Sequence, residues 1–80
     1  MIILVYKRIR DLREDHDLKQ RELAEYLKVF QTAYSKYELG YLKIPPEILC
    51  RLADYYNTSI DYLLGRTDEK NPFPKGKNYK

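Results

Sequence analysis

The sequence of 80 residues contains few of the residues that most catalytic and metal sites require. It has 1 cysteine and 1 histidine, which exclude an internal disulfide and a zinc finger with its set of Cys and His ligands. Its 3 glycines form no Gly-rich loop that could hold phosphate groups. The apolar run at residues 2–5 is too short for a signal peptide or a membrane span. We therefore expect a cytoplasmic protein that is not an enzyme, binds no metal or cofactor and does not associate with a membrane.

The single cysteine and the single histidine stand in no pattern that indicates chemistry. Cys50 follows Leu49 on a helical pattern of apolar residues, which predicts a small side chain in the core. His16 lies among charged residues at the end of the first helical segment, which predicts a solvated loop residue. Neither position indicates a redox or nucleophilic centre.

Charge is distributed unevenly along the chain. The 15 Lys and Arg residues give a net charge of +3 against the 12 Asp and Glu residues, a surplus too small by itself to indicate a partner. Residues 45–69 carry a net charge of −3, whereas residues 70–80 carry 4 lysines and no acidic residue. A surface that binds a polyanion is therefore expected before Ile44, with the basic tail as a further contributor.

Apolar residues recur at helical spacing in five short segments. These segments cover residues 5 to about 16, about 20–27, 31–39, 46–56 and 59–65. Gly40 and Gly65 end two of them, because glycine tolerates the left-handed conformation of a helix end. Pro45 and Pro46 precede the fourth segment, and Ser59 is a suitable N-cap for the fifth. No strand hairpin signal or internal repeat is present, so the sequence predicts an all-α fold.

Residues 18–40, LKQRELAEYLKVFQTAYSKYELG, hold the second and third of these segments. Only about three residues join the two helices, which must therefore cross at a wide angle, and Ala24 is small enough to allow their close approach. With RIRDLRED before it and LADYYNTSIDYLLG after it, this order of segments resembles the phage-repressor and Cro-type (XRE) helix-turn-helix family of transcription regulators. The resemblance implies a compact five-helix lambda-repressor-like DNA-binding domain at residues 1–66 and a basic C-terminal tail at residues 67–80.

The resemblance also implies how the domain would bind a double-stranded DNA operator. The helix at residues 31–39 would be the recognition helix, with its first residues against base edges in the major groove. The implied base-reading residues are Gln31, Thr32, Ser35 and Lys36, and the implied phosphate-binding residues are Gln20, Tyr41 and Lys43. An amide such as that of Gln31 can pair bidentately with adenine. Arg13 and Glu38 match a partly buried ion pair that orients the recognition helix.

Several positions depart from the family pattern. Lys28 stands where glycine is frequent in the turn, so a residue with a β-carbon has to adopt the left-handed conformation. Phe30 and Lys19 replace the side chains that usually accept a hydrogen bond at the starts of the two helices, which leaves Glu22 without its capping-box partner. Tyr34 replaces an aliphatic residue, so its hydroxyl must find a partner. Leu39 replaces a polar residue. Phe30 and Leu39 are both apolar on the expected DNA-binding face, which leaves a protein partner open at this surface.

A single domain of this size would cover only a half-site, so we expect a homodimer on an inverted repeat. The family often dimerises through the fifth helix and the residues after it. The apolar N-terminus is the other candidate for the dimer surface, with coverage of the core as its alternative role. The candidate dimerisation residues are Ile2, Ile3, Leu4, Tyr62, Leu63, Leu64 and Phe73. We expect a small bacterial or phage transcriptional regulator, a repressor, that binds specific DNA sequences. The alternative is an antitoxin-like or anti-regulator module that uses the same fold to bind a protein.

Overall fold

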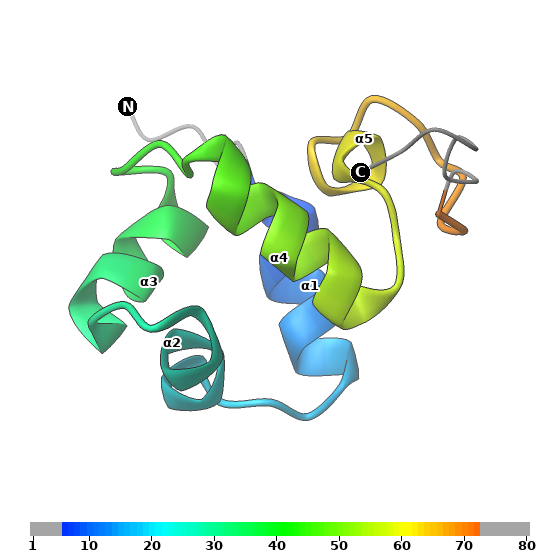
Figure 1. Cartoon of the computed structure of the whole chain (residues 1–80). Coiled ribbons are helices and arrows are strands. Elements are labelled where there is room, and N and C mark those ends of the chain that lie inside the picture. The colour runs from blue at the N-terminus through cyan, green and yellow to red at the C-terminus, as the bar shows by residue number, and fades with distance from the viewer. Residues whose placement is uncertain (1–5, 73–80) are drawn as a thin grey trace.

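The computed structural model describes residues 6–72, which form five helices joined by short loops (Figure 1). The helices are α1 (Lys7–Asp15), α2 (Gln20–Leu27), α3 (Gln31–Leu39), α4 (Pro46–Tyr56) and α5 (Ile60–Leu63). No strand occurs within residues 6–72. The all-α five-helix fold is therefore confirmed, and the predicted bounds of α3 and α4 agree with those of the structure. Val5, the predicted start of the first helix, lies outside the described residues.

Residues in the left-handed conformation end three of the helices. Gly40 follows α3 with a φ of 83°, as expected for a glycine at this position. Lys28 follows α2 with a φ of 60°, and Asn57 follows α4 with a φ of 53°. At the start of α5, the Ser59 hydroxyl accepts a hydrogen bond from the Tyr62 amide at 3.0 Å, so the predicted N-cap is confirmed.

The left-handed turn at Lys28 predicts a stabilising substitution. A residue with a β-carbon costs about 1–2 kcal/mol in this conformation, whereas glycine is free of that strain but loses more backbone entropy on folding. We expect Lys28→Gly to raise the free energy of unfolding by about 0.5–1 kcal/mol, as measured by urea unfolding. Lys28→Ala removes the same charge but keeps the β-carbon, so it should give no gain. Equal stability of the two variants would contradict the account.

The core lies between the five helices and takes apolar side chains from each of them. In Figure 1, α2 and α3 lie on one side of α4 and α5 lies on the other. The largest fully buried side chains are those of Ile9, Leu23, Leu27, Tyr34, Leu52 and Leu63. Tyr34 is the one of these that belongs to α3, and it buries one side of that helix in the core while Gln31, Thr32 and Lys36 stay exposed.

The prediction that Cys50 is a core residue is wrong, because its side chain is exposed. α4 buries Ile48, Leu49, Leu52, Ala53 and Tyr56. An α-helix advances by about 100° per residue, so Cys50 lies about 130° around the helix from the middle of this buried stripe. The exposure of Cys50 therefore depends on its angular position around α4 and could not be inferred from its adjacency to the buried Leu49.

Arg51 of α4 holds the end of α2 and so the turn that leads into α3. Its guanidinium donates hydrogen bonds to the backbone carbonyl of Leu27 at 3.1 Å and to that of Tyr26. The guanidinium carbon also lies 5.1 Å from the centroid of the Tyr26 ring, whose other neighbour is the Tyr55 ring at a centroid distance of 4.7 Å. These contacts satisfy two carbonyls at a helix end that would otherwise lack partners.

Residues 66–72 contain no helix but are attached to the domain. Arg8 of α1 donates hydrogen bonds to the carbonyl oxygens of Tyr62, at 3.1 Å, and Thr67, and pairs with the Asp68 carboxylate at 2.7 Å. The Thr58 hydroxyl donates to the carbonyl oxygen of Lys70. The beginning of the predicted tail thus packs on the domain, and residues 73–80 lie outside the described residues.

Candidate nucleic-acid interface

α3 presents a polar side to solvent. The helix turns Tyr34, Tyr37 and Glu38 toward the core. Of the residues predicted to read bases, Gln31, Thr32 and Lys36 are exposed and Ser35 is half-buried. The structure therefore brings these hydrogen-bonding side chains together on the open side of the first turns of α3.

The exposed charged side chains of α3 and of the loops that flank it are positive. Lys28, Lys36 and Lys43 are exposed on α3 and on the loops that flank it. The sequence from 28 to 43 holds one acidic residue, Glu38, and only 4% of its surface is exposed. No exposed carboxylate therefore opposes the lysines within residues 28–43, which leaves a surface suited to a polyanion.

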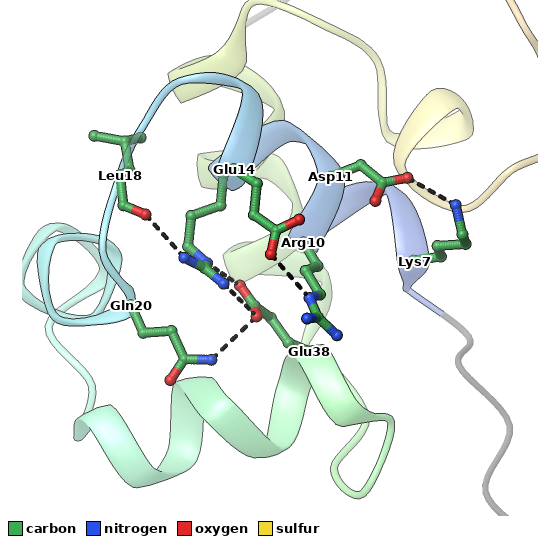
Figure 2. A network of polar contacts seen from close by, with 8 residues as sticks. Lys7, Arg10, Asp11, Glu14, Leu18, Gln20 and Glu38 are labelled. Atoms are coloured by element: carbon green, nitrogen blue, oxygen red, sulfur yellow. Dashed lines mark hydrogen bonds and ion pairs between the residues drawn. The ribbon is translucent and has the colours of Figure 1, made fainter.

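Glu38 joins α3 to α1 and α2 through a polar network (Figure 2). Its carboxylate accepts hydrogen bonds from Arg13 Nε at 2.6 Å and from Arg13 Nη2 at 3.2 Å, a bidentate pairing. Gln20 Nε2, at the start of α2, donates to Glu38 Oε1 at 3.1 Å, and Arg13 Nη1 donates to the Leu18 carbonyl at 2.8 Å. The pair is largely buried, with side-chain exposures of 13% for Arg13 and 3% for Glu38. The hydrogen bond with Glu38 raises the pKa of Arg13, so this partner stays charged at any pH of interest.

Two tyrosine hydroxyls are buried near this network without a well-formed hydrogen bond. Among the described residues the Tyr56 hydroxyl has no partner, and the Tyr34 hydroxyl has only a contact with the Glu38 carboxylate that falls short of a well-formed hydrogen bond. Burial is the main cause that raises the pKa of each phenol above its ordinary value. The Glu38 carboxylate lies close enough to add to the increase in both pKa values. The two rings are therefore buried in the core although their hydroxyl groups are poorly hydrogen-bonded there.

The starts of α2 and α3 lack side-chain caps, as the sequence predicted. Lys19 and Phe30 carry no acceptor that could bind a free amide at these ends. Glu22, however, accepts a hydrogen bond from the Lys19 amide at 2.8 Å. The prediction that Glu22 has no partner is therefore wrong, because half of a capping box needs only the backbone of the N-cap residue.

The residues predicted to bind phosphate lie in two different environments. Gln20 is half-buried, and one hydrogen of its amide is used by Glu38, which leaves the other for an external acceptor. Tyr41 and Lys43 are exposed in the loop after α3. The Tyr41 amide donates to the Lys36 carbonyl at 2.9 Å, which fixes the start of this loop against the end of α3.

The predicted dimerisation residues are divided by the structure. Leu63 is 1% exposed and belongs to the core of its own domain, so it is withdrawn from the candidate surface. Tyr62 and Leu64 are half-buried, and the Arg8 guanidinium lies 4.2 Å from the centroid of the Tyr62 ring. The other candidates, Ile2, Ile3, Leu4 and Phe73, lie outside the described residues.

Sequence reasoning missed the positions that hold the site in place from a distance. Arg8 and Arg51 bind backbone carbonyls of other segments, and nothing in their local sequence signals such partners. The contact between the Tyr26 and Tyr55 rings could not be predicted either, because it depends on how α2 lies relative to α4.

Comparison with known proteins decides the family. A family model described as helix-turn-helix matches residues 9–63. The chain belongs to this helix-turn-helix family. The resemblance to XRE-family regulators is thereby confirmed, and the match includes all five helices except the first residues of α1. Helix-turn-helix regulators of this kind bind DNA and are typically not enzymes.

Individual helix-turn-helix proteins agree with this assignment. The chain is 39% identical over 74 residues to the uncharacterized HTH-type transcriptional regulator YobD of Bacillus subtilis, covering 92% of the chain and 66% of that protein. It is similar in structure to a transcriptional regulator from Listeria innocua, with a TM-score of 0.74, 35% identity, and coverage of 81% of this chain and 61% of that one. It is also 29% identical over 69 residues to the antitoxin PezA of Streptococcus pneumoniae, covering 86% of the chain and 44% of that protein.

The chain thus spans less than two thirds of the length of each of these relatives. Within residues 6–72, no helix combines the length and the hydrophobicity that a membrane span requires. The same residues contain no group of His, Cys, Asp or Glu side chains that could hold a metal ion.

Proposed function

We propose that this chain binds specific sequences of double-stranded DNA as a transcriptional repressor, with α3 in the major groove. The observation that supports this most strongly is the open side of α3, where hydrogen-bonding side chains and lysines are exposed and the acidic residue is buried. Major-groove recognition needs a helix that offers donors and acceptors to base edges without repelling the phosphates around them. The helix-turn-helix family is consistent with this function.

Each exposed side chain has a proposed role. Gln31, at the start of α3, pairs with adenine through its amide, and Lys36 binds guanine or a phosphate. Thr32 and Ser35 contribute hydroxyl groups to the same base edges. Tyr41 and Lys43 in the following loop and Gln20 at the start of α2 bind the DNA backbone. The Arg13 and Glu38 pair touches no base and acts by fixing the angle at which α3 is presented.

The proposed DNA-binding domain comprises residues 1–66, and a basic segment follows it. We expect this domain to act as a homodimer. One α3 helix reads only a half-site, and the few phosphate contacts of one domain give weak binding at physiological salt. Two copies on an inverted repeat would double both contributions. The apolar residues at 2–5 and the surface of α5 around Tyr62 and Leu64 remain the candidate contacts.

Replacement of Gln31 tests the base-reading role. Duplexes that bind should first be selected from a random pool, and we expect a single motif with inverted symmetry. Gln31→Ala should then weaken binding to the selected duplex by about 5-fold to 150-fold for each half-site, because a good bidentate amide pair discriminates by about 1–3 kcal/mol. Its affinity for unrelated DNA should stay unchanged. Asn71→Ala removes an exposed amide from the segment after α5 and should bind as the wild type does.

The role proposed for Gln31 fails if no sequence is enriched, or if Gln31→Ala binds the selected duplex with wild-type affinity. The first result would overturn specific DNA binding itself. The second would leave DNA binding in place and move the base reading to other residues.

A second candidate function is recognition of a protein partner, as in the antitoxin-like alternative. It is supported by the similarity to PezA and by the exposed Tyr26 and Tyr55 rings, which form a pair on α2 and α4. Salt separates the two candidates. Binding to DNA should weaken steeply as salt rises, whereas an apolar protein contact should be nearly indifferent to it.

A further inference from the structure

Phe30 is the most exposed large apolar side chain among the described residues, with 84% of its surface accessible. It occupies the N-cap position of α3, directly before Gln31, and its backbone is extended with φ −66° and ψ 146°. Phenylalanine at this position removes the side-chain acceptor that would stabilise the start of the helix. The fold therefore gains nothing evident from the ring, which lies at the edge of the proposed base-reading surface.

The surroundings of Phe30 do not suggest a surface for protein docking. Its exposed neighbours in sequence are Lys28, Gln31 and Thr32, all of them polar, and Val29 is half-buried. The next exposed apolar side chain along α3 is Leu39, at the far end of a helix that is about 13 Å long. A single ring surrounded by hydrogen-bonding and cationic side chains fits a partner that is mostly polar and anionic but carries a small apolar group.

The thymine methyl is the group of that kind in the major groove, where other base-pair edges offer donors and acceptors. We infer that Phe30 is a specificity-determining residue that packs against the C5-methyl group of a thymine beside the base pair contacted by Gln31. The inference rests on the proposed function and adds to it a preference for thymine at one position of each half-site. In this arrangement Lys28 and Lys36 bind the DNA backbone, the Phe30 ring contacts the thymine methyl group, and the Gln31 amide pairs with the neighbouring base.

Deoxyuridine provides a direct test, because it lacks only the methyl group of thymine. Each thymine of the selected duplex is replaced singly by deoxyuridine, and affinity is measured by fluorescence anisotropy. The wild type should lose about fourfold at one position per half-site, the factor expected from exposing one methyl group. Phe30→Ala should bind the thymine duplex more weakly than the wild type and should show no further loss with deoxyuridine at that position.

Two controls keep the result interpretable. Tyr55→Ala removes an exposed ring from α4 and should keep the full response to deoxyuridine. Because Phe30 is exposed, Phe30→Ala should melt at the wild-type temperature, so a loss of affinity would not reflect unfolding.

The inference is overturned if no thymine is sensitive in the wild type, or if Phe30→Ala retains the full sensitivity. Either result, obtained with a duplex whose binding depends on Gln31, leaves the proposed function intact. Failure to select any duplex would overturn both proposals.

Discussion

Glu38→Ala is expected to lower the free energy of unfolding by about 3–5 kcal/mol, because it leaves a largely buried guanidinium without its partner. Arg13 would lose both of its hydrogen bonds to the carboxylate, and Gln20 would lose the acceptor of its amide. A single core of this size contributes only about 3–5 kcal/mol of net stability, so the variant should be marginally stable at room temperature. Circular dichroism during thermal and urea unfolding measures the change.

Glu47→Ala is the matched control, since it removes an exposed glutamate from the first turn of α4. It should change the free energy of unfolding by no more than about 0.5 kcal/mol. The double variant Arg13→Met with Glu38→Leu should be more stable than Glu38→Ala alone, because no charge remains buried. An unchanged melting temperature for Glu38→Ala would show that the ion pair does not hold α3 in place.

Alkaline pH is expected to unfold the protein steeply through Tyr34 and Tyr56. Burial raises the pKa of both phenols in the folded state, whereas both titrate near their ordinary pKa of about 10 when unfolded. A raised folded pKa means that stability is fully present below pH 10 and is lost as pH rises above it. Each phenol should cost about 1.4 kcal/mol per pH unit above pH 10, or about 2.7 kcal/mol for the two together.

Urea unfolding at a series of pH values from 9 to 11.5 measures this slope. The double variant Tyr34→Phe with Tyr56→Phe should lose most of the slope, and at pH 7 it should be about as stable as the wild type because neither hydroxyl makes a well-formed hydrogen bond. Tyr41→Phe changes an exposed phenol and should keep the wild-type slope. A double variant as sensitive to alkali as the wild type would refute the role of the two buried hydroxyls.

The elements of this fold that could be predicted from the sequence are those with local signals at their ends. Gly40 ends α3, and Pro46 stands at the first position of α4, so the bounds of both helices follow from residue types alone. The side of α3 that faces solvent was predicted from the family resemblance, and its exposure follows from the burial of Tyr34, Tyr37 and Glu38.

The features that could not be predicted depend on contacts between segments distant in sequence. Arg51 binds the end of α2 across 24 residues, and Arg8 binds the Thr67 carbonyl across 59. No helical period marks such partners, because a surface arginine and an arginine that binds a backbone carbonyl have the same local pattern. The burial of Leu63 and the exposure of Cys50 likewise depend on which angle of each helix meets the core.

The burial of Glu38 links stability to the proposed function. Its carboxylate is the acidic group nearest the base-reading residues in sequence, and its pairing with Arg13 withdraws it from the surface of α3. One contact therefore both orients the helix and keeps negative charge away from the phosphates of DNA.

The central claim, that DNA binds the open side of α3, is tested most directly by NMR with isotope-labelled protein and the selected duplex. The account predicts that the backbone amides of residues 31–36 and 41–43 shift on addition of the duplex, while those around Tyr26 and Tyr55 stay in place. A scrambled duplex at the same concentration should give smaller shifts. Shifts centred on Tyr26 and Tyr55, or equal shifts with both duplexes, would contradict it.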